Sequence, residues 1–207
     1  KGITVEVHWR LLTGPAREPS FTELWQNRQQ SQLTKKPVFM LGVEHLFFYL
    51  VLHGAQHGWS RLRWLYDIHQ FSTRQLDWQY INGLMKKYVV VPVGGQGILL
   101  ASSLFGSQFS HQSLFVSKKA EKLVEWTTFY LKKMINLHSD SLEEEIDRYH
   151  KRYLFNLMGK RQKVLFILSY LYPYPEDVKT LPLPEKVHFL YFILRPFLWI
   201  WRKVAFK

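Results

Sequence analysis

The 207-residue sequence contains no cysteine. A disulfide framework, a thiolate zinc site and a thiol nucleophile are therefore excluded. A cysteine-free chain agrees with a cytoplasmic protein, because disulfides are rare in that compartment, and a cytoplasmic location is what we expect. The first residues also lack Met and any signal-peptide pattern, so we expect the chain to begin inside a longer protein.

A long uninterrupted apolar run is missing as well. The most apolar stretch covers residues 187–206, whereas a membrane-spanning helix needs about 18 or more nearly uncharged residues. The stretch is interrupted by His188, Arg195, Pro196, Arg202 and Lys203. The sequence therefore predicts no transmembrane segment.

Acidic residues are scarce relative to basic ones: 16 Asp and Glu stand against 28 Lys and Arg, which gives a net charge of +12. Such a surface attracts polyanions, and nucleotides, nucleic acids and anionic lipid headgroups all qualify. Charge alone selects none of the three.

What the sequence does contain is enough apolar material for a core, since 47% of the residues are hydrophobic. Residues 3–11 alternate between apolar and polar with a period of two, which predicts one β-strand. The remainder reads as a series of helices. We therefore expect a mainly α fold with two parts, a terminal strand and turn (1–19) and a helical domain (20–207).

The helix boundaries follow from capping residues. A capping box over Ser20 to Glu23 predicts a helix through Trp25. An apolar run predicts a second helix from Val43 to His57, which Gly58 is expected to end. Ser60 is expected to cap the helix that follows. Further helices are expected over 78–88, capped by Asp77, then up to Phe105, and over 117–136, 142–157 (capped by 139–141) and 160–171. The last of these is expected to end at Pro173 and Pro175, and a linker is expected at Pro182 to Pro184. The sequence Gly-Gly-x-Gly at 94–97 is interpreted as a helix start rather than a phosphate loop.

The most informative stretch is residues 53–67 (HGAQHGWSRLRWLYD), where the apolar run stops and ionisable side chains crowd together. His53 and His57 lie four residues apart, so on a helix they share a face. Gly54 and Gly58 form a second stripe without side chains beside them. A neighbouring helix or a ligand can approach the backbone closely there, and the spacing does not decide between the two.

Two chemistries are open for this stretch. In the first, His53 and His57 bind zinc with Asp67 or Glu44 as a third ligand, although the residue after the first histidine is Gly54 and not the glutamate that zinc proteases require. In the second, the basic residues contact phosphate.

Arg61 and Arg63 carry the second alternative. They either neutralise a phosphate near a helix N-terminus, or Arg63 simply pairs with Asp67 four residues later on an exposed face. Glu6, on the polar face of the expected strand, could hold Mg²⁺, which prefers oxygen ligands, but a single carboxylate does not complete such a site.

Several separated segments together resemble the bacterial family of uncharacterised nucleotidyltransferases. They are residues 5–11 (VEVHWRL), 53–67, 175–177 (PED), 181–184 (LPLP) and 195–196 (RP). The resemblance extends over nearly the whole chain, and it places this chain in the C-terminal portion of such a protein.

The resemblance implies a polymerase-β-like nucleotidyltransferase, with a small sheet that carries a Gly-Ser turn and an Asp-x-Asp pair before a helical domain. Glu6 looks like the third carboxylate of its Mg²⁺ site. The residues implied to contact the nucleotide or the acceptor are His53, His57, Trp59, Arg61, Arg63 and Asp67.

This sequence contains no Gly-Ser turn followed by an Asp-x-Asp pair. We therefore expect the chain to be inactive alone and to need an N-terminal nucleotidyltransferase core from the same or another chain. The leading hypothesis is Mg²⁺-dependent transfer of a nucleoside monophosphate from an NTP, expected to be ATP, to an unknown acceptor. The alternatives are a zinc hydrolase and a non-enzymatic basic helical module that binds nucleic acid, an anionic membrane or a partner protein.

Overall fold

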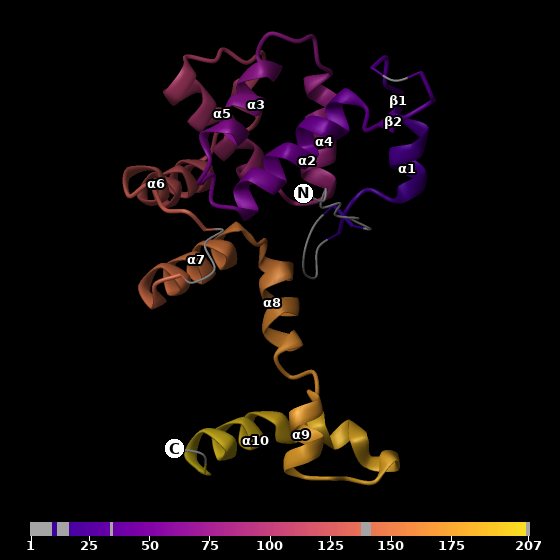
Figure 1. Cartoon of the computed structure of the whole chain (residues 1–207), viewed down its shortest axis with the longest axis vertical. Helices are drawn as coiled ribbons and strands as arrows, with labels where there is room; N and C mark the ends of the chain where they lie inside the picture. Colours follow the sequence, from indigo (N-terminus) through magenta and orange to yellow (C-terminus); the bar gives the residue numbers. More distant parts are fainter. Residues whose placement is uncertain (1–9, 12–16, 34, 138–141, 206–207) are drawn as a thin grey trace. The chain divides into compact units, whose positions relative to one another are not determined.

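A computed structural model of the chain describes residues 10–11, 17–33, 35–137 and 142–205. Its contacts divide the chain into two compact units, residues 1–159 and 160–207 (Figure 1). The described residues are mainly helical, with one two-stranded antiparallel sheet. The expected mainly α fold is confirmed.

The strand expected over residues 3–11 lies, except for its last two residues, outside the described ranges, and so does Glu6. The structure instead shows a small hairpin that the sequence analysis did not predict. Its strands, β1 (Gln29–Gln30) and β2 (Phe39–Met40), each contain only two residues. The boundary expected after residue 19 stays a prediction.

Helix α1 (Phe21–Gln26) begins at the predicted cap: the Ser20 side chain accepts a hydrogen bond from the Glu23 N–H. The reciprocal half of the expected capping box is replaced by longer-range contacts. The Glu23 carboxylate accepts hydrogen bonds from Lys87 (2.9 Å) and from the Tyr88 hydroxyl (3.1 Å). These contacts fasten α1 to the end of a helix more than sixty residues later in the chain.

Four helices form the centre of the first unit (Figure 1). They are α2 (Val43–Gln56), α3 (Leu62–Phe71), α4 (Trp78–Lys87) and α5 (Val91–Phe105). The predicted Asp77 cap of α4 is present, with the Asp77 carboxylate 2.8 Å from the Tyr80 N–H. The predicted Ser60 cap is absent, because Arg61 occupies the N-cap position of α3 without a side-chain hydrogen bond.

Helix α5 lies in the middle of this unit and contacts α2, α3, α4 and α6. Residues 94–97 fall within its first two turns and are buried, so the helix-start interpretation of Gly-Gly-x-Gly is confirmed. A Cβ on Gly95 would stand 2.2 Å from the Phe115 carbonyl oxygen. These glycines permit close packing of α5 against its neighbours.

The first unit continues with a short 3-10 helix η1 (Gln112–Leu114), α6 (Lys118–Lys132) and α7 (Glu144–Leu157). The Ser117 side chain caps α6, which begins one residue after the predicted start of this helix. Helix α7 starts two residues later than expected, with Glu143 at its N-cap. The serine cap predicted at 139–141 lies outside the described residues.

The second unit contains α8 (Lys160–Ser169), α9 (Pro175–Thr180), a 3-10 helix η2 (Glu185–Leu190) and α10 (Tyr191–Ala205). Helix α9 was not predicted: it begins at Pro175, where the sequence predicts a helix end, and it precedes the predicted linker at Pro182 to Pro184. Within the described ranges, the structure contains no helix with the length and apolarity needed to cross a membrane.

Candidate functional site

The stretch 53–67 forms the end of α2, a tight turn and the start of α3 (Figure 1). The turn is a Schellman motif. The Trp59 N–H donates to the Gly54 carbonyl (2.8 Å), and the Gly58 N–H donates to the Ala55 carbonyl (2.9 Å). Gly58 has φ +59°, a left-handed conformation that glycine adopts without steric cost. The sequence expectation that Gly58 ends this helix is confirmed.

The glycine stripe is occupied by aromatic side chains of the chain itself. A Cβ on Gly54 would come within 2.3 Å of the Trp59 ring, and a Cβ on Gly58 within 2.7 Å of the Tyr130 ring. Trp59 has no exposed surface, and its Nε1 has no hydrogen-bond partner among the described residues. The structure therefore places Trp59 in the core and does not bring it to the surface with the other expected contact residues.

The two histidines share a face of α2, as predicted, with ring centroids 4.6 Å apart. Both meet the indole of Trp64, which comes from the first turn of α3. The His57 ring stacks on it at 5.1 Å, and the His53 ring meets its edge at 5.7 Å. Trp64 is thus the centre of the site, a role that the sequence analysis missed because this residue also fits the apolar face of α3.

The two arginines of the stretch lie beside the same indole. The guanidinium carbons of Arg61 and Arg63 are 5.6 and 5.8 Å from a Trp64 ring centroid, which is within cation–π range. Neither guanidinium takes part in an ion pair or a hydrogen bond within the described part of the chain. The pairing of Arg63 with Asp67, one of the two sequence alternatives, is therefore not formed.

Asp67 follows one turn after Arg63 and is half-buried. Burial raises the pKa of its carboxyl, and the Arg63 guanidinium opposes that change only in part. A carboxylate in this position forms no ion pair within the described residues and can accept hydrogen bonds from a ligand.

The zinc alternative finds no support in the geometry. The described residues contain no group of three His, Asp or Glu side chains able to hold a metal ion. Glu44 lies nine residues before His53 on α2, about 13 Å away at the rise of an α-helix. Its carboxylate oxygen lies 3.5 Å from the Asp77 N–H.

A buried network of hydrogen bonds connects α5, α6 and α7 to the last turn of α2. The Gln96 side chain of α5 donates to the Leu123 carbonyl (2.8 Å) and to the Thr127 hydroxyl (2.6 Å) of α6. The Tyr153 hydroxyl of α7 lies 3.1 Å from the same Gln96 nitrogen and donates to Ala55 in the last turn of α2. Three helices therefore fix the backbone that presents His53 and His57.

A Gly-Ser pair does occur in the chain, at Gly106 and Ser107. It ends α5, where Gly106 has φ +66°, and no Asp-x-Asp follows. The Ser107 hydroxyl donates to the Ala101 carbonyl and lies 2.8 Å from Nδ1 of His69. This pair is a helix terminus and does not supply the missing phosphate-binding turn.

The comparisons with known proteins agree with the resemblance noted above. Residues 1–106 match the family model described as an uncharacterised nucleotidyltransferase. The match includes Glu6 and all of 53–67 but ends before 175–177, 181–184 and 195–196. It therefore does not extend over nearly the whole chain, as the resemblance did. It also does not match the expected place of the chain in the C-terminal portion of such a protein. No curated protein and no solved structure matches the chain.

Proposed function

Because the chain belongs to the family of uncharacterised nucleotidyltransferases, we propose that residues 53–67 form a contact surface for a nucleoside triphosphate or its acceptor. The reaction served would be transfer of a nucleoside monophosphate, expected to come from ATP, to an acceptor whose identity stays open.

The observation that supports this proposal is the arrangement of Arg61 and Arg63 around Trp64. Two guanidinium groups that form no ion pair among the described residues lie beside one indole ring. A guanidinium binds phosphate oxygens with two parallel hydrogen bonds. The Trp64 ring is only 7% exposed, so its part in the proposal is to position the two arginines. The start of α3, which has no side-chain cap, adds free backbone N–H groups that favour an anion.

The histidines and Asp67 complete the proposed surface. His57 stacks on Trp64 and holds the indole between α2 and the arginines, and His53 lies at the ring edge. In this proposal both imidazoles and the Asp67 carboxyl contact the nucleotide or the acceptor.

The proposed cofactor is Mg²⁺ bound with the NTP. The described residues do not provide a site for it, and Glu6, its proposed ligand, lies outside them. The function assigned to the described residues is therefore binding and orientation. Phosphoryl-transfer enzymes depend largely on positioning and charge neutralisation, so a positioning surface of this kind is a substantial part of such a catalyst.

We further propose that this chain alone does not transfer nucleotides. An Asp-x-Asp pair is absent from its sequence, so a polymerase-β-like core would have to come from the same longer protein or from another chain. In this proposal, nucleotide transfer requires that such a core be present together with this chain.

Equilibrium binding of Mg·ATP to the full 207-residue chain tests the proposal. The double substitution Arg61→Ala/Arg63→Ala should weaken binding at least about tenfold, because each charge-assisted hydrogen bond contributes about 1.5–3 kcal/mol. Arg74→Ala is the matched control: Arg74 also lies beside an aromatic ring, that of Phe71, but outside residues 53–67. Equal binding by the double variant and the parent chain would contradict the proposal.

A second candidate is a non-enzymatic basic helical module for nucleic acid, an anionic membrane or a partner protein. The net charge of +12 favours it. A chain that binds a polyanion in low salt, but shows no ATP binding sensitive to Arg61 and Arg63, would support this candidate over the first.

A further inference from the structure

The second unit has an inverted distribution of polar and apolar side chains. The Asp177 side chain has no exposed surface. Its two oxygens accept hydrogen bonds from Arg195 (2.5 Å) and Arg202 (2.7 Å) of α10, and Arg195 also donates to the Tyr170 carbonyl. The charged groups of α10 that form ion pairs therefore point inward.

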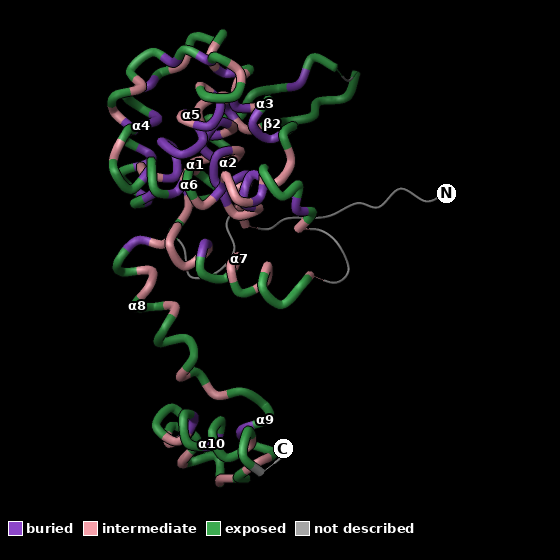
Figure 2. The backbone as a smooth tube through the Cα atoms, turned by 90° about the vertical axis from the view of Figure 1, so that its left-hand side faces the viewer, coloured by how far each residue is buried: buried purple, intermediate pink, exposed green. Residues whose placement is uncertain are grey.

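The apolar side chains of α10 point outward. Tyr191 and Leu198 are buried, but most other aromatic and aliphatic residues of the helix are between 45% and 74% exposed. Figure 2 shows the contrast between this unit and the buried helices α2 and α5. The exposed set comprises Phe192, Ile193, Phe197, Trp199, Ile200, Trp201 and Val204.

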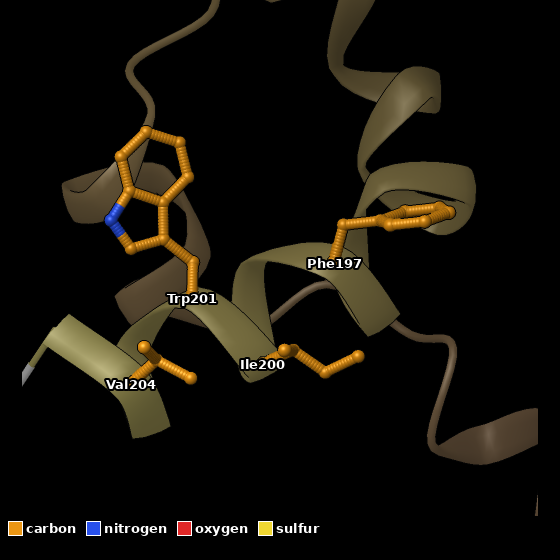
Figure 3. Close-up of a pocket in the computed structure, with 4 residues that line it drawn as sticks. All are labelled: Phe197, Ile200, Trp201 and Val204. Atoms are coloured by element: carbon orange, nitrogen blue, oxygen red, sulfur yellow. The ribbon is translucent and has the colours of Figure 1, made fainter.

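Part of this outward face forms an open apolar hollow. It has a volume of about 380 Å³ and is lined by Phe197, Ile200, Trp201 and Val204 (Figure 3). The four residues follow the spacing i, i+3, i+4 and i+7, which is one face of a helix. Clustered side chains of this size cost free energy in water, since each contributes about 1.5–3 kcal/mol when it is buried.

The charge of the unit indicates what covers this face. Residues 160–207 carry nine Lys and Arg against three Asp and Glu, and Asp177 is already neutralised inside the unit. Helix α10 contains no acidic residue. The Lys203 ammonium lies over the Trp199 ring at 4.4 Å, so a cation lies beside an exposed tryptophan of this helix.

From these observations we propose that the second unit docks on an anionic lipid bilayer, with α10 lying in the plane of the interface. The proposal is independent of the nucleotide-binding function proposed above. Tryptophan side chains favour the interface between lipid and water, basic residues are attracted to anionic headgroups, and an amphipathic helix with both features lies along the surface.

The length of α10 fits this orientation. Its 15 residues extend about 22 Å, which is shorter than the roughly 30 Å hydrocarbon core of a bilayer. The helix therefore lies on the membrane without spanning it. A nucleic acid would be attracted by the same charges but would not cover aliphatic side chains such as Ile193, Ile200 and Val204.

The test is flotation of the full chain with vesicles of equal parts phosphatidylcholine and phosphatidylglycerol, compared with phosphatidylcholine alone. We expect the chain to float with the mixed vesicles and to bind the neutral ones more weakly. Phe197→Ser/Trp201→Ser should reduce the partition coefficient at least about tenfold, because two large apolar side chains are lost from the interface.

The matched control is Phe21→Ser, which alters an equally exposed aromatic residue in the first unit and should leave flotation unchanged. A second pair on the same face, Ile200→Ser/Val204→Ser, gives an independent reading if the first variant loses its circular dichroism signal. The same direction of change in both pairs is expected.

Three results would overturn the proposal. The first is failure of the parent chain to float with the mixed vesicles. The second is binding that high salt abolishes but both outward-face pairs leave intact, which indicates attraction by charge alone. The third is self-association of the vesicle-free chain that these pairs abolish without affecting flotation, which identifies a second copy as the occupant of the face.

Discussion

The Tyr153 hydroxyl donates a 2.8 Å hydrogen bond to the backbone carbonyl oxygen of Ala55, 98 residues earlier in the chain. Ala55 lies between His53 and His57 on α2, so this bond ties α7 to the turn that presents the candidate site. The same carbonyl accepts the Gly58 N–H of the Schellman turn at 2.9 Å. The tyrosine therefore supplies a second hydrogen bond to a carbonyl oxygen that has two lone pairs.

Tyr153→Phe should destabilise the chain by about 0.5–1.5 kcal/mol, because the Ala55 carbonyl loses one buried hydrogen bond and keeps the one from the Gly58 N–H. Urea denaturation measures the effect. Tyr66→Phe, at an exposed tyrosine, is the control and should change the free energy of unfolding by less than about 0.5 kcal/mol. Equal effects of the two substitutions would show that the network does not support the turn.

Gly54→Ala should destabilise the chain by about 1–3 kcal/mol or more, since the added methyl overlaps the Trp59 ring and forces the core to shift. The matched substitution is Gly83→Ala in α4. There the new Cβ meets nothing within 4 Å, and alanine should stabilise the helix by about 0.5–1 kcal/mol. Thermal denaturation distinguishes the two, and a shift of the same sign at both positions would contradict this packing account.

Much of the fold could be predicted because its signals are local. Asp77 occupies the cap position that its sequence context indicates, and the apolar run of α2 ends where Gly58 permits a left-handed conformation. Ser60 shows the limit of this reasoning. Its neighbour Arg61 occupies the N-cap position of α3 instead and makes no side-chain capping hydrogen bond.

The candidate site could be predicted only in part, for a tertiary reason. Helical periodicity correctly placed His53 and His57 on one face. Periodicity could not show that the turn places the Trp59 ring against Gly54 and Gly97, where an added Cβ would lie 2.3 and 3.1 Å from that ring. It also could not show that Trp64 belongs to both the core and the site. The sequence also could not predict that the apolar side chains of α10 point outward. That arrangement follows because Arg195 and Arg202 point inward to Asp177, and the position of Asp177 is known only from the structure.

The stability of the chain should decrease as the pH falls through the histidine range. Burial lowers the pKa of His45 and of His150, although Glu23 and Asp147 oppose the change. The unfolded chain, with a histidine pKa of about 6.5, then binds more protons than the folded chain in the window below that value, so stability is lost there.

Urea titrations on either side of that window measure this loss. His45→Gln should reduce the pH dependence, whereas His111→Gln, at an exposed position, is the matched control. An unchanged pH dependence in the His45 variant would contradict the assignment.

Asp177→Ala should destabilise the second unit by about 3–5 kcal/mol, because Arg195 and Arg202 lose their shared anion. Hydrogen exchange of residues 160–205 measures this locally, with the exposed neighbour Glu176→Ala as control.

Burial opposes ionisation of Asp177, but the Tyr174 N–H and the two guanidiniums outweigh it and lower the pKa. The stabilisation is therefore present at neutral pH and lost as the pH falls through that lowered value. Protection that survives in the Asp177 variant would show the ion pairs to be dispensable.

The central claim, that residues 53–67 contact a nucleotide, is tested most directly by photo-crosslinking. The full chain would be irradiated with an azido-ATP analogue and Mg²⁺, and the labelled peptides identified by mass spectrometry. We predict that the label falls within 53–67, is displaced by unlabelled ATP, and is lost in Arg61→Ala/Arg63→Ala but retained in Arg74→Ala. Displaceable label confined to other parts of the chain would contradict the claim.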